Sequence, residues 1–191
     1  LVSLIETPIE RITPQGIKTS DREREFDIII YATGFDAITG ALDRIDIRGV
    51  GGLKLKDKWQ DGPRTYLGLQ SVGFPNLFTL VGPHNTATLC NIPRCIEQNV
   101  EWVSGVIGHL RSHQLQSVVP SEEAERSWTQ HVNEIAEYTL FTKVNSWFTG
   151  VNTNVPGKDK PRIVVYVGGA PAYRERCDQE SANGYPGFVL Q

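Results

Sequence analysis

Two short apolar segments that each end at a glycine most constrain the fold of this chain. Phe26–Tyr31 is β-branched and apolar apart from one aspartate, and it runs directly into Ala-Thr-Gly at 32–34. Leu77–Val81 is similar and stops at Gly82-Pro83. Continuous apolar runs of this length are typical of strands that are buried on both faces of a helix-covered sheet. The sequence therefore predicts an α/β fold with both segments as interior strands.

Two longer segments have the apolar spacing of α-helices. The first covers about 92–112, with Asn91 as a possible N-cap and Pro93 in the first turn. The second covers about 121–141 and begins with Ser121 as a cap, followed by two glutamates that suit a helix N-terminus. These two helices are the strongest secondary-structure predictions in the chain.

The remaining segments read as short strands and loops. Ile9–Ile12 and Ile17–Thr19 are strand-like runs on either side of a Pro-Gln-Gly turn. The segment 145–161 is rich in Gly, Asn and Pro, which favours a loop, and Arg162–Val167 follows it as a third strand candidate. A short helix that Gly184 can close comes last.

Composition excludes several classes of protein. The chain has 191 residues, 39% of them hydrophobic and 21% charged, with a net charge of −3, which is typical of a globular domain. Lys and Arg are scattered singly, so nucleic acid is not expected as a partner. The apolar runs are too short to span a membrane, and the first twelve residues do not resemble a signal peptide.

The metal-ligating residue types are sparse. Cys90, Cys95 and Cys177 form an odd set without CxxC spacing, which argues against a disulfide framework or a zinc site. His109 and His113 are four apart on a predicted helix without an acidic third ligand nearby, so we expect a solvated face. These features predict a reduced, cytoplasmic protein without a metal. Because the chain contains no Met and begins within a strand-like run, we also expect it to be a fragment or a processed chain.

Three features predict a ligand site, although each also has an ordinary structural explanation. A strand that ends in small residues lets a cofactor approach the backbone at Thr33 and Gly34, or it is simply a strand followed by a turn. The unpaired N–H groups near Asn91 attract an anionic group, or they belong to a normally capped helix. Trp147, within a Gly- and Asn-rich loop, suits the anchor of a mobile lid, or it packs on the core.

Five motifs, which occur in a fixed order along the chain, resemble those of a known enzyme family. They are DIIIYATGF at 27–35, GFPNLFTLVGP at 73–83, the following segment 84–102, NSWFTG with VPGK within 145–158, and YVGGAPAYR with GYPGF within 166–188. Together they resemble type I Baeyer–Villiger monooxygenases, which are flavin-containing and NADPH-dependent. The loop before Pro156 is longer than the spacing that is common in this family.

The resemblance implies the C-terminal part of a flavoprotein that has two Rossmann-like dinucleotide-binding domains and a helical segment. Residues 1–34 would be the end of the NADPH-binding domain with the ATG linker, and 35–191 the C-terminal part of the FAD-binding domain, with 145–161 as a mobile loop. FAD and NADPH are the implied cofactors. The implied reaction uses O₂ to convert a ketone, cyclic or bulky, to an ester or lactone.

The resemblance also implies particular site residues. The implied cofactor contacts are Thr33, Gly34, Gly82, Pro83, Asn91, Ile92 and Trp147. The implied lining of the ketone pocket is Ala87, Thr88, Leu89 and Cys90, with Cys90 as a small packing residue rather than a nucleophile. The catalytic arginine and the GxGxxG motifs of the family are expected upstream of Leu1, in a missing N-terminal part of the same enzyme. The chain alone is therefore expected to hold no catalytic residue and to be inactive.

Two other functions remain open. A flavin monooxygenase that oxygenates nitrogen or sulfur shares the ATG motif, although it is not expected to carry the SWxxG and GYxGF motifs. Alternatively, the chain is a non-catalytic fragment or interaction module of the same fold, which the lack of glycine-rich dinucleotide motifs would favour.

Overall fold

The computed structural model describes residues 1–86 and 89–191, and their contacts divide the chain into Leu1–Phe35 and Asp36–Gln191. The first unit holds three short antiparallel strands in the order β1-β2-β3. They are β1 (Ile9–Thr13), β2 (Gly16–Thr19) and β3 (Glu23–Glu25). The strand-like runs predicted on either side of the Pro-Gln-Gly turn are confirmed, and the structure adds that β1 and β2 pair antiparallel across it.

The prediction of a buried strand at Phe26–Tyr31 is wrong. This segment has no regular secondary structure, and Ile28 and Ile30 are 79% and 83% exposed. An interior strand needs a neighbouring strand on each edge and a covering layer on each face. The unit Leu1–Phe35 supplies only short, polar strands, so it offers this apolar run nothing to pair with or pack on.

The second unit is mainly helical, and its two longest helices, α3 and α4, confirm the helices that the apolar spacing predicts. The helices are α1 (Gly40–Asp43), α2 (Leu55–Lys58), α3 (Ile92–Ser112), α4 (Glu122–Glu137) and α5 (Ala170–Ala182). The 3-10 turns are Val50–Gly52, Leu140–Lys143 and Trp147–Thr149, and β4 (Val118–Pro120) pairs with β5 (Phe188–Leu190). The Ser121 side chain accepts from the Ala124 N–H and caps α4, as predicted. That helix ends earlier than expected, because the Thr139 side chain caps the next 3-10 turn instead.

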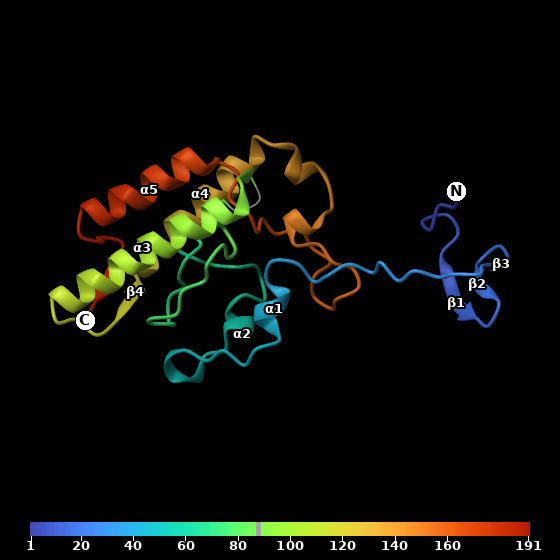
Figure 1. Cartoon of the computed structure of the whole chain (residues 1–191), viewed down its shortest axis with the longest axis horizontal. Helices are drawn as coiled ribbons and strands as arrows, with labels where there is room; N and C mark the ends of the chain where they lie inside the picture. The colour runs from blue at the N-terminus through green and yellow to red at the C-terminus, as the bar shows by residue number, and fades with distance from the viewer. Residues whose placement is uncertain (87–88) are drawn as a thin grey trace. The chain divides into compact units, whose positions relative to one another are not determined.

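Helices α3, α4 and α5 enclose the main core, and α3 and α5 run side by side (Figure 1). The buried members from these helices are Trp102, Val106, Leu110, Trp128, Val132, Tyr173 and Cys177. Trp102 also donates its indole N–H to the Cys177 carbonyl at 2.9 Å, so its burial leaves no donor unpaired. Burial of large side chains of this kind stabilises a fold by about 1.5–3 kcal/mol each, which makes this the best-anchored part of the unit.

Two further strand predictions fail although the predicted burial is partly right. Leu77–Val81 is half-buried but irregular, and Val81 has a left-handed φ of +47°. Arg162–Val167 has no regular secondary structure and belongs to no sheet, although Val164 and Tyr166 are buried. Its backbone bonds go to turns rather than to a neighbouring strand, so no ladder forms.

The C-terminal tail is fixed by a close approach between Gly187 and Tyr66. A Cβ at Gly187 would lie 2.5 Å from the Tyr66 ring, so only glycine fits there. Glu180 joins the two, since it accepts from the Tyr66 hydroxyl at 2.7 Å and from the Gly187 N–H. The GYPGF motif therefore has a packing role. Within the described residues, no helix has both the length and the apolar character that crossing a membrane requires.

Candidate functional site

The segment that begins at Gly82 is tightly packed against its neighbours. A Cβ at Gly82 would lie 2.5 Å from the Thr79 hydroxyl, and one at Gly68 would lie 2.6 Å from the Asn85 nitrogen. His84 is held at a left-handed φ of +63°, which is costly for a residue with a side chain. Pro83 is buried here as well. Packing explains why Gly82 must be glycine, independently of any cofactor.

A buried polar network supports this segment from the helices. The Asn85 amide donates to Asn99 of α3 at 3.0 Å and to the Tyr173 hydroxyl of α5 at 2.7 Å. That hydroxyl donates in turn to the Leu67 carbonyl at 2.7 Å, and Asn99 also accepts from the Val81 N–H at 2.9 Å. Burial raises the pKa of Tyr173, which keeps its hydroxyl a donor. The network fixes the backbone on both sides of Gly82.

Sequence reasoning missed this network, although one signal was available. Asn99 follows Cys95 by four residues and precedes Trp102 by three, so it lies on the buried face of α3. A polar residue at a core position of an amphipathic helix has to find hydrogen-bond partners, and a buried network is the usual result. Neither Asn85 nor Tyr173 has a comparable signal, because their contact depends on the tertiary fold.

His84 is structural rather than a base. Its Nε2 faces the Ile163 carbonyl at 3.0 Å, which can only accept, and its Nδ1 lies 3.2 Å from the Thr65 hydroxyl. Burial lowers the pKa of His84 to about 4, and the bond to Ile163 offsets only part of that effect. His84 is thus a neutral imidazole that ties the segment to the chain at 163.

Backbone hydrogen bonds link this segment to the loop that carries Trp147. The His84 N–H donates to Val164 at 3.0 Å, and the Arg162 N–H donates to Thr149 at 2.7 Å. Residues 162–166 therefore join the segment after Gly82 to the 3-10 turn Trp147–Thr149. This arrangement brings together two regions that are more than 60 residues apart in the sequence, roughly the separation of His84 and Trp147.

Trp147 is not packed in the core. It is 55% exposed and stacks on Phe148 with ring centroids 4.7 Å apart, and Phe148 meets Phe141 edge-on at 5.2 Å. The turn ends at Gly150, whose φ of +65° suits glycine. A large aromatic ring on a rigid support with one face open is well suited to covering a planar ligand.

The start of α3 is open to a ligand. Asn91 occupies the N-cap position, but its side chain does not cap the helix, and Pro93 lies in the first turn. Leu89 and Ile92 are 45% and 51% exposed beside this end. Unpaired N–H groups and the positive end of the helix dipole favour an anionic group here.

Two buried polar atoms of the segment after Gly82 have no partner among the described residues. They are the side-chain oxygens of Asn85 and Thr86. Buried polar groups in native proteins are normally hydrogen-bonded, so a ligand with donors at this place would complete the site. A flavin has such ring N–H and carbonyl groups, and the chemistry of the residues fits it.

The remaining predicted site residues are distributed as follows. Ala87 and Thr88 lie outside the described residues. Thr33 and Gly34 are exposed and belong to the first unit, and Gly34 has a left-handed φ of +76°. No group of three or more His, Cys, Asp or Glu residues that could hold a metal ion occurs in 1–86 and 89–191.

Cys90 and Cys95 correct the expectation that the cysteines remain unpaired. Their sulfur atoms are at disulfide-bonding distance, whereas Cys177 is a free, buried thiol. Cys90 precedes the N-cap of α3 and Cys95 lies in its first turns, so the change of direction at the helix start brings them together. Sequence spacing alone does not reveal such a local reversal.

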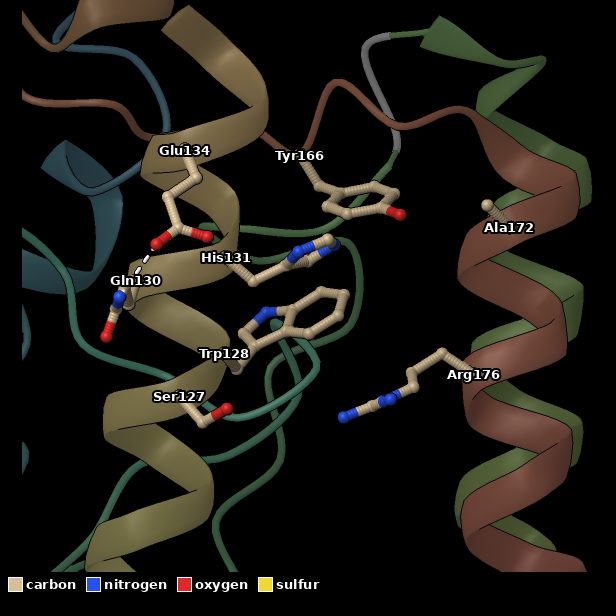
Figure 2. A pocket seen from close by; sticks show the side chains of 8 residues that line it. All are labelled: Ser127, Trp128, Gln130, His131, Glu134, Tyr166, Ala172 and Arg176. Carbon is tan, nitrogen blue, oxygen red and sulfur yellow. Dashed lines mark hydrogen bonds between the residues drawn. The ribbon is translucent and has the colours of Figure 1, made fainter.

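A separate cavity of about 460 Å³ lies between α4 and α5. Its lining residues are Ser127, Trp128, Gln130, His131, Glu134, Tyr166, Ala172 and Arg176. Figure 2 shows Arg176 reaching from α5 towards α4, on the side of Trp128 and Ser127. Of the site residues singled out from the sequence, those that the structure describes do not line this cavity.

Comparison with known proteins gives close relatives along nearly the whole chain. A 2-oxo-Δ3-4,5,5-trimethylcyclopentenylacetyl-CoA monooxygenase of Pseudomonas putida is 47% identical over 190 residues, covering 100% of this chain and 35% of that protein. Phenazine N-monooxygenase PhzNO1 of Lysobacter antibioticus is 39% identical over 191 residues, which cover 100% of this chain and 34% of that protein. A Baeyer–Villiger monooxygenase of Pseudooceanicola batsensis is 41% identical over 183 residues, which cover 95% of this chain and 33% of that protein. No protein-family model matches the chain.

Solved structures agree with these relatives. A crystal structure of OTEMO in complex with FAD and NADP has a TM-score of 0.91 and 48% identity, covering 100% of this chain and 34% of that one. The closed crystal structure of a cyclohexanone monooxygenase has a TM-score of 0.92 and 41% identity, covering 100% and 35%. The predicted α/β flavoprotein fold is thereby confirmed. The chain spans about a third of the length of the curated relatives that it matches.

Proposed function

We propose that this chain belongs to the Baeyer–Villiger monooxygenase family and forms the C-terminal portion of an FAD- and NADPH-dependent enzyme that converts ketones to esters or lactones with O₂. The observation that carries the proposal is the match over the full chain to a structure that holds FAD and NADP. The buried side-chain oxygens of Asn85 and Thr86, which have no partner among the described residues, and the start of α3, which no side chain caps, support it from the chain's own geometry.

We assign the chain's residues to three tasks. The start of α3, with Asn91 and Ile92, would hold the flavin ring system, and Gly82-Pro83 would set the backbone that leads to it. When bound, FAD and NADPH supply the electrons with which O₂ is activated. The polar network under Asn85 contributes rigidity, because its hydrogen bonds fix the groups that face the cofactor before it binds.

The substrate pocket would be formed by residues 87–90. Leu89 is exposed beside the start of α3, which suits contact with an apolar ketone. Cys90 would be a packing residue at the edge of this pocket. We propose a cyclic or bulky ketone, which is in keeping with the names of a cyclohexanone monooxygenase and the cyclopentenylacetyl-CoA monooxygenase among the related proteins.

Trp147 would cover the nicotinamide cofactor, and its open face and stacked support suit that task. Thr33 and Gly34 would contact cofactor at the linker between the two dinucleotide-binding domains. We accordingly assign 1–34 to the end of the NADPH-binding domain and 35–191 to the FAD-binding domain. The division of the chain into Leu1–Phe35 and Asp36–Gln191 supports this boundary. A cytoplasmic location is part of the same proposal.

A second candidate is oxygenation of nitrogen, which the 39% identity to a phenazine N-monooxygenase favours. The experiment that separates the two supplies the full-length protein with FAD, NADPH and ¹⁸O₂, and offers cyclohexanone and phenazine separately. We expect a lactone that carries one ¹⁸O atom, formed with consumption of one NADPH per lactone. An N-oxide together with untouched ketone would favour the second candidate. A purified protein without flavin absorbance and without either product would favour a non-catalytic role.

A further inference from the structure

The loop 145–161 ends at a lysine whose partners lie far away in the sequence. The Lys158 ammonium donates to Asp36 at 2.8 Å, to Asp43 at 2.8 Å and to the Thr39 hydroxyl at 3.0 Å. An ammonium has three N–H donors, and each of them has an acceptor here. In Figure 1 this loop, drawn in orange, reaches the chain around α1. The hydrogen-bonding capacity of the Lys158 ammonium is thus fully used by these three residues.

The cluster around Lys158 is largely shielded from water. The side chains of Lys158 and Asp36 are each 17% exposed, and that of Asp43 is 28% exposed. Gly40 makes room for it, since a Cβ there would lie 2.5 Å from Asp36 side-chain atoms. Ion pairs at such depth are screened by salt much less than surface pairs, and loss of one partner leaves a charge without compensation.

The charges support a permanently protonated lysine. Burial by itself lowers the pKa of Lys158, but the hydrogen bonds to Asp36 and Asp43 outweigh it and leave the pKa raised. Lys158 therefore keeps its positive charge throughout the neutral range.

Backbone hydrogen bonds close the end of the loop on itself and attach it to the chain that follows. Asn152 donates to the Lys158 carbonyl at 2.7 Å, which closes the turn between them. The bond from Arg162 to Thr149 then connects the chain after Lys158 to the turn of Trp147. Two glycines have left-handed φ values here, Gly150 just before the closed turn and Gly157 within it. The Lys158 cluster and the 149–162 bond are consequently two of the points at which the loop is held.

We infer that Lys158 is a positioning residue that anchors the loop 145–161 to the segment 36–43 and thereby sets the place of Trp147. The significance of that place rests on the proposed function, in which Trp147 covers the nicotinamide cofactor. Because the segment 36–43 directly follows the Ala-Thr-Gly motif, the anchor also ties the loop to the chain that emerges from the linker.

Hydrogen exchange in the full-length protein tests the anchor without reference to activity. Lys158→Met keeps the aliphatic stem but removes the charge, and Asp36→Asn removes one acceptor charge. We expect amide exchange over 146–158 to become about tenfold faster in each. In the double variant the effect should be smaller than the product of the two single effects, since both substitutions remove the same Lys158–Asp36 ion pair. Lys160→Met is the matched control, because Lys160 is exposed and makes no ion pair among the described residues.

Two results separate this inference from the proposed function. Unchanged exchange in Lys158→Met and Asp36→Asn would overturn the anchor. If the loop does loosen, the NADPH KM should rise several-fold with a smaller change in kcat, and Lys158→Arg should restore part of the loss. Faster exchange with an unchanged NADPH KM and unchanged coupling would leave the anchor in place but contradict the cofactor role of Trp147.

Discussion

The helical core and the segments that carry the proposed site are held together in different ways. The core of α3, α4 and α5 consists of large apolar side chains in regular helices. The segments around His84 and Trp147 have little regular structure and depend on backbone bonds, a buried polar network and residues in left-handed conformations. The two regions meet where Asn99 and Tyr173 reach out of the helices to Asn85. Hydrophobic burial thus supplies stability, while polar bonds place the site.

The largest expected effect is on the free energy of unfolding, and it is found by replacing one tryptophan with alanine in each region. Trp102→Ala should lower the free energy of unfolding by about 3–5 kcal/mol, because it leaves a cavity in the core and frees the Cys177 carbonyl. Trp147→Ala should change it by less than about 0.5 kcal/mol, because that side chain is mostly exposed. Chemical denaturation of the full-length protein measures both. Equal losses would remove the distinction between core and site.

The next effect depends on pH and belongs to His84. Its pKa is 6.5 when unfolded and about 4 when buried, so between these values only the unfolded state takes up the proton. The stability from the neutral imidazole is fully present above pH 6.5 and is lost as the pH falls towards 4, by about 3 kcal/mol. The unfolding free energy of His84→Gln should depend less on pH across this window. Parallel pH profiles of the two proteins would contradict the buried, neutral state of His84.

A smaller effect tests the connection between the regions. Tyr173→Phe removes the hydroxyl that joins Asn85 to Leu67, which should cost about 1–3 kcal/mol because buried polar groups lose their partner. Tyr185→Phe is the control, since its hydroxyl has no hydrogen-bond partner among the described residues and its loss should cost less than about 0.5 kcal/mol. FAD affinity, measured by fluorescence titration, should fall for Tyr173→Phe only. A normal FAD affinity would mean that the network does not place the site.

The same comparison explains what the sequence could predict. Helix α3 and the cap of α4 follow from local spacing and capping chemistry, and both are confirmed. The strands expected at Phe26–Tyr31 and Leu77–Val81 are absent, because an apolar run becomes a strand only where neighbours pair with it. The Lys158 cluster and the partners of Asn85 join residues far apart in the chain, and periodicity carries no information about such contacts. The family motifs located the candidate site, but they did not reveal what supports it.

The most direct test of the central claim is the coupling of NADPH oxidation to product formation in the full-length protein carrying Trp147→Ala. The claim is that this chain supplies the part of a ketone-oxygenating site that covers the cofactors. It predicts that the variant, nearly as stable as the wild type, forms much less lactone per NADPH consumed and releases the balance as hydrogen peroxide, with a raised NADPH KM. An unchanged ratio of lactone to NADPH with an unchanged KM would contradict it.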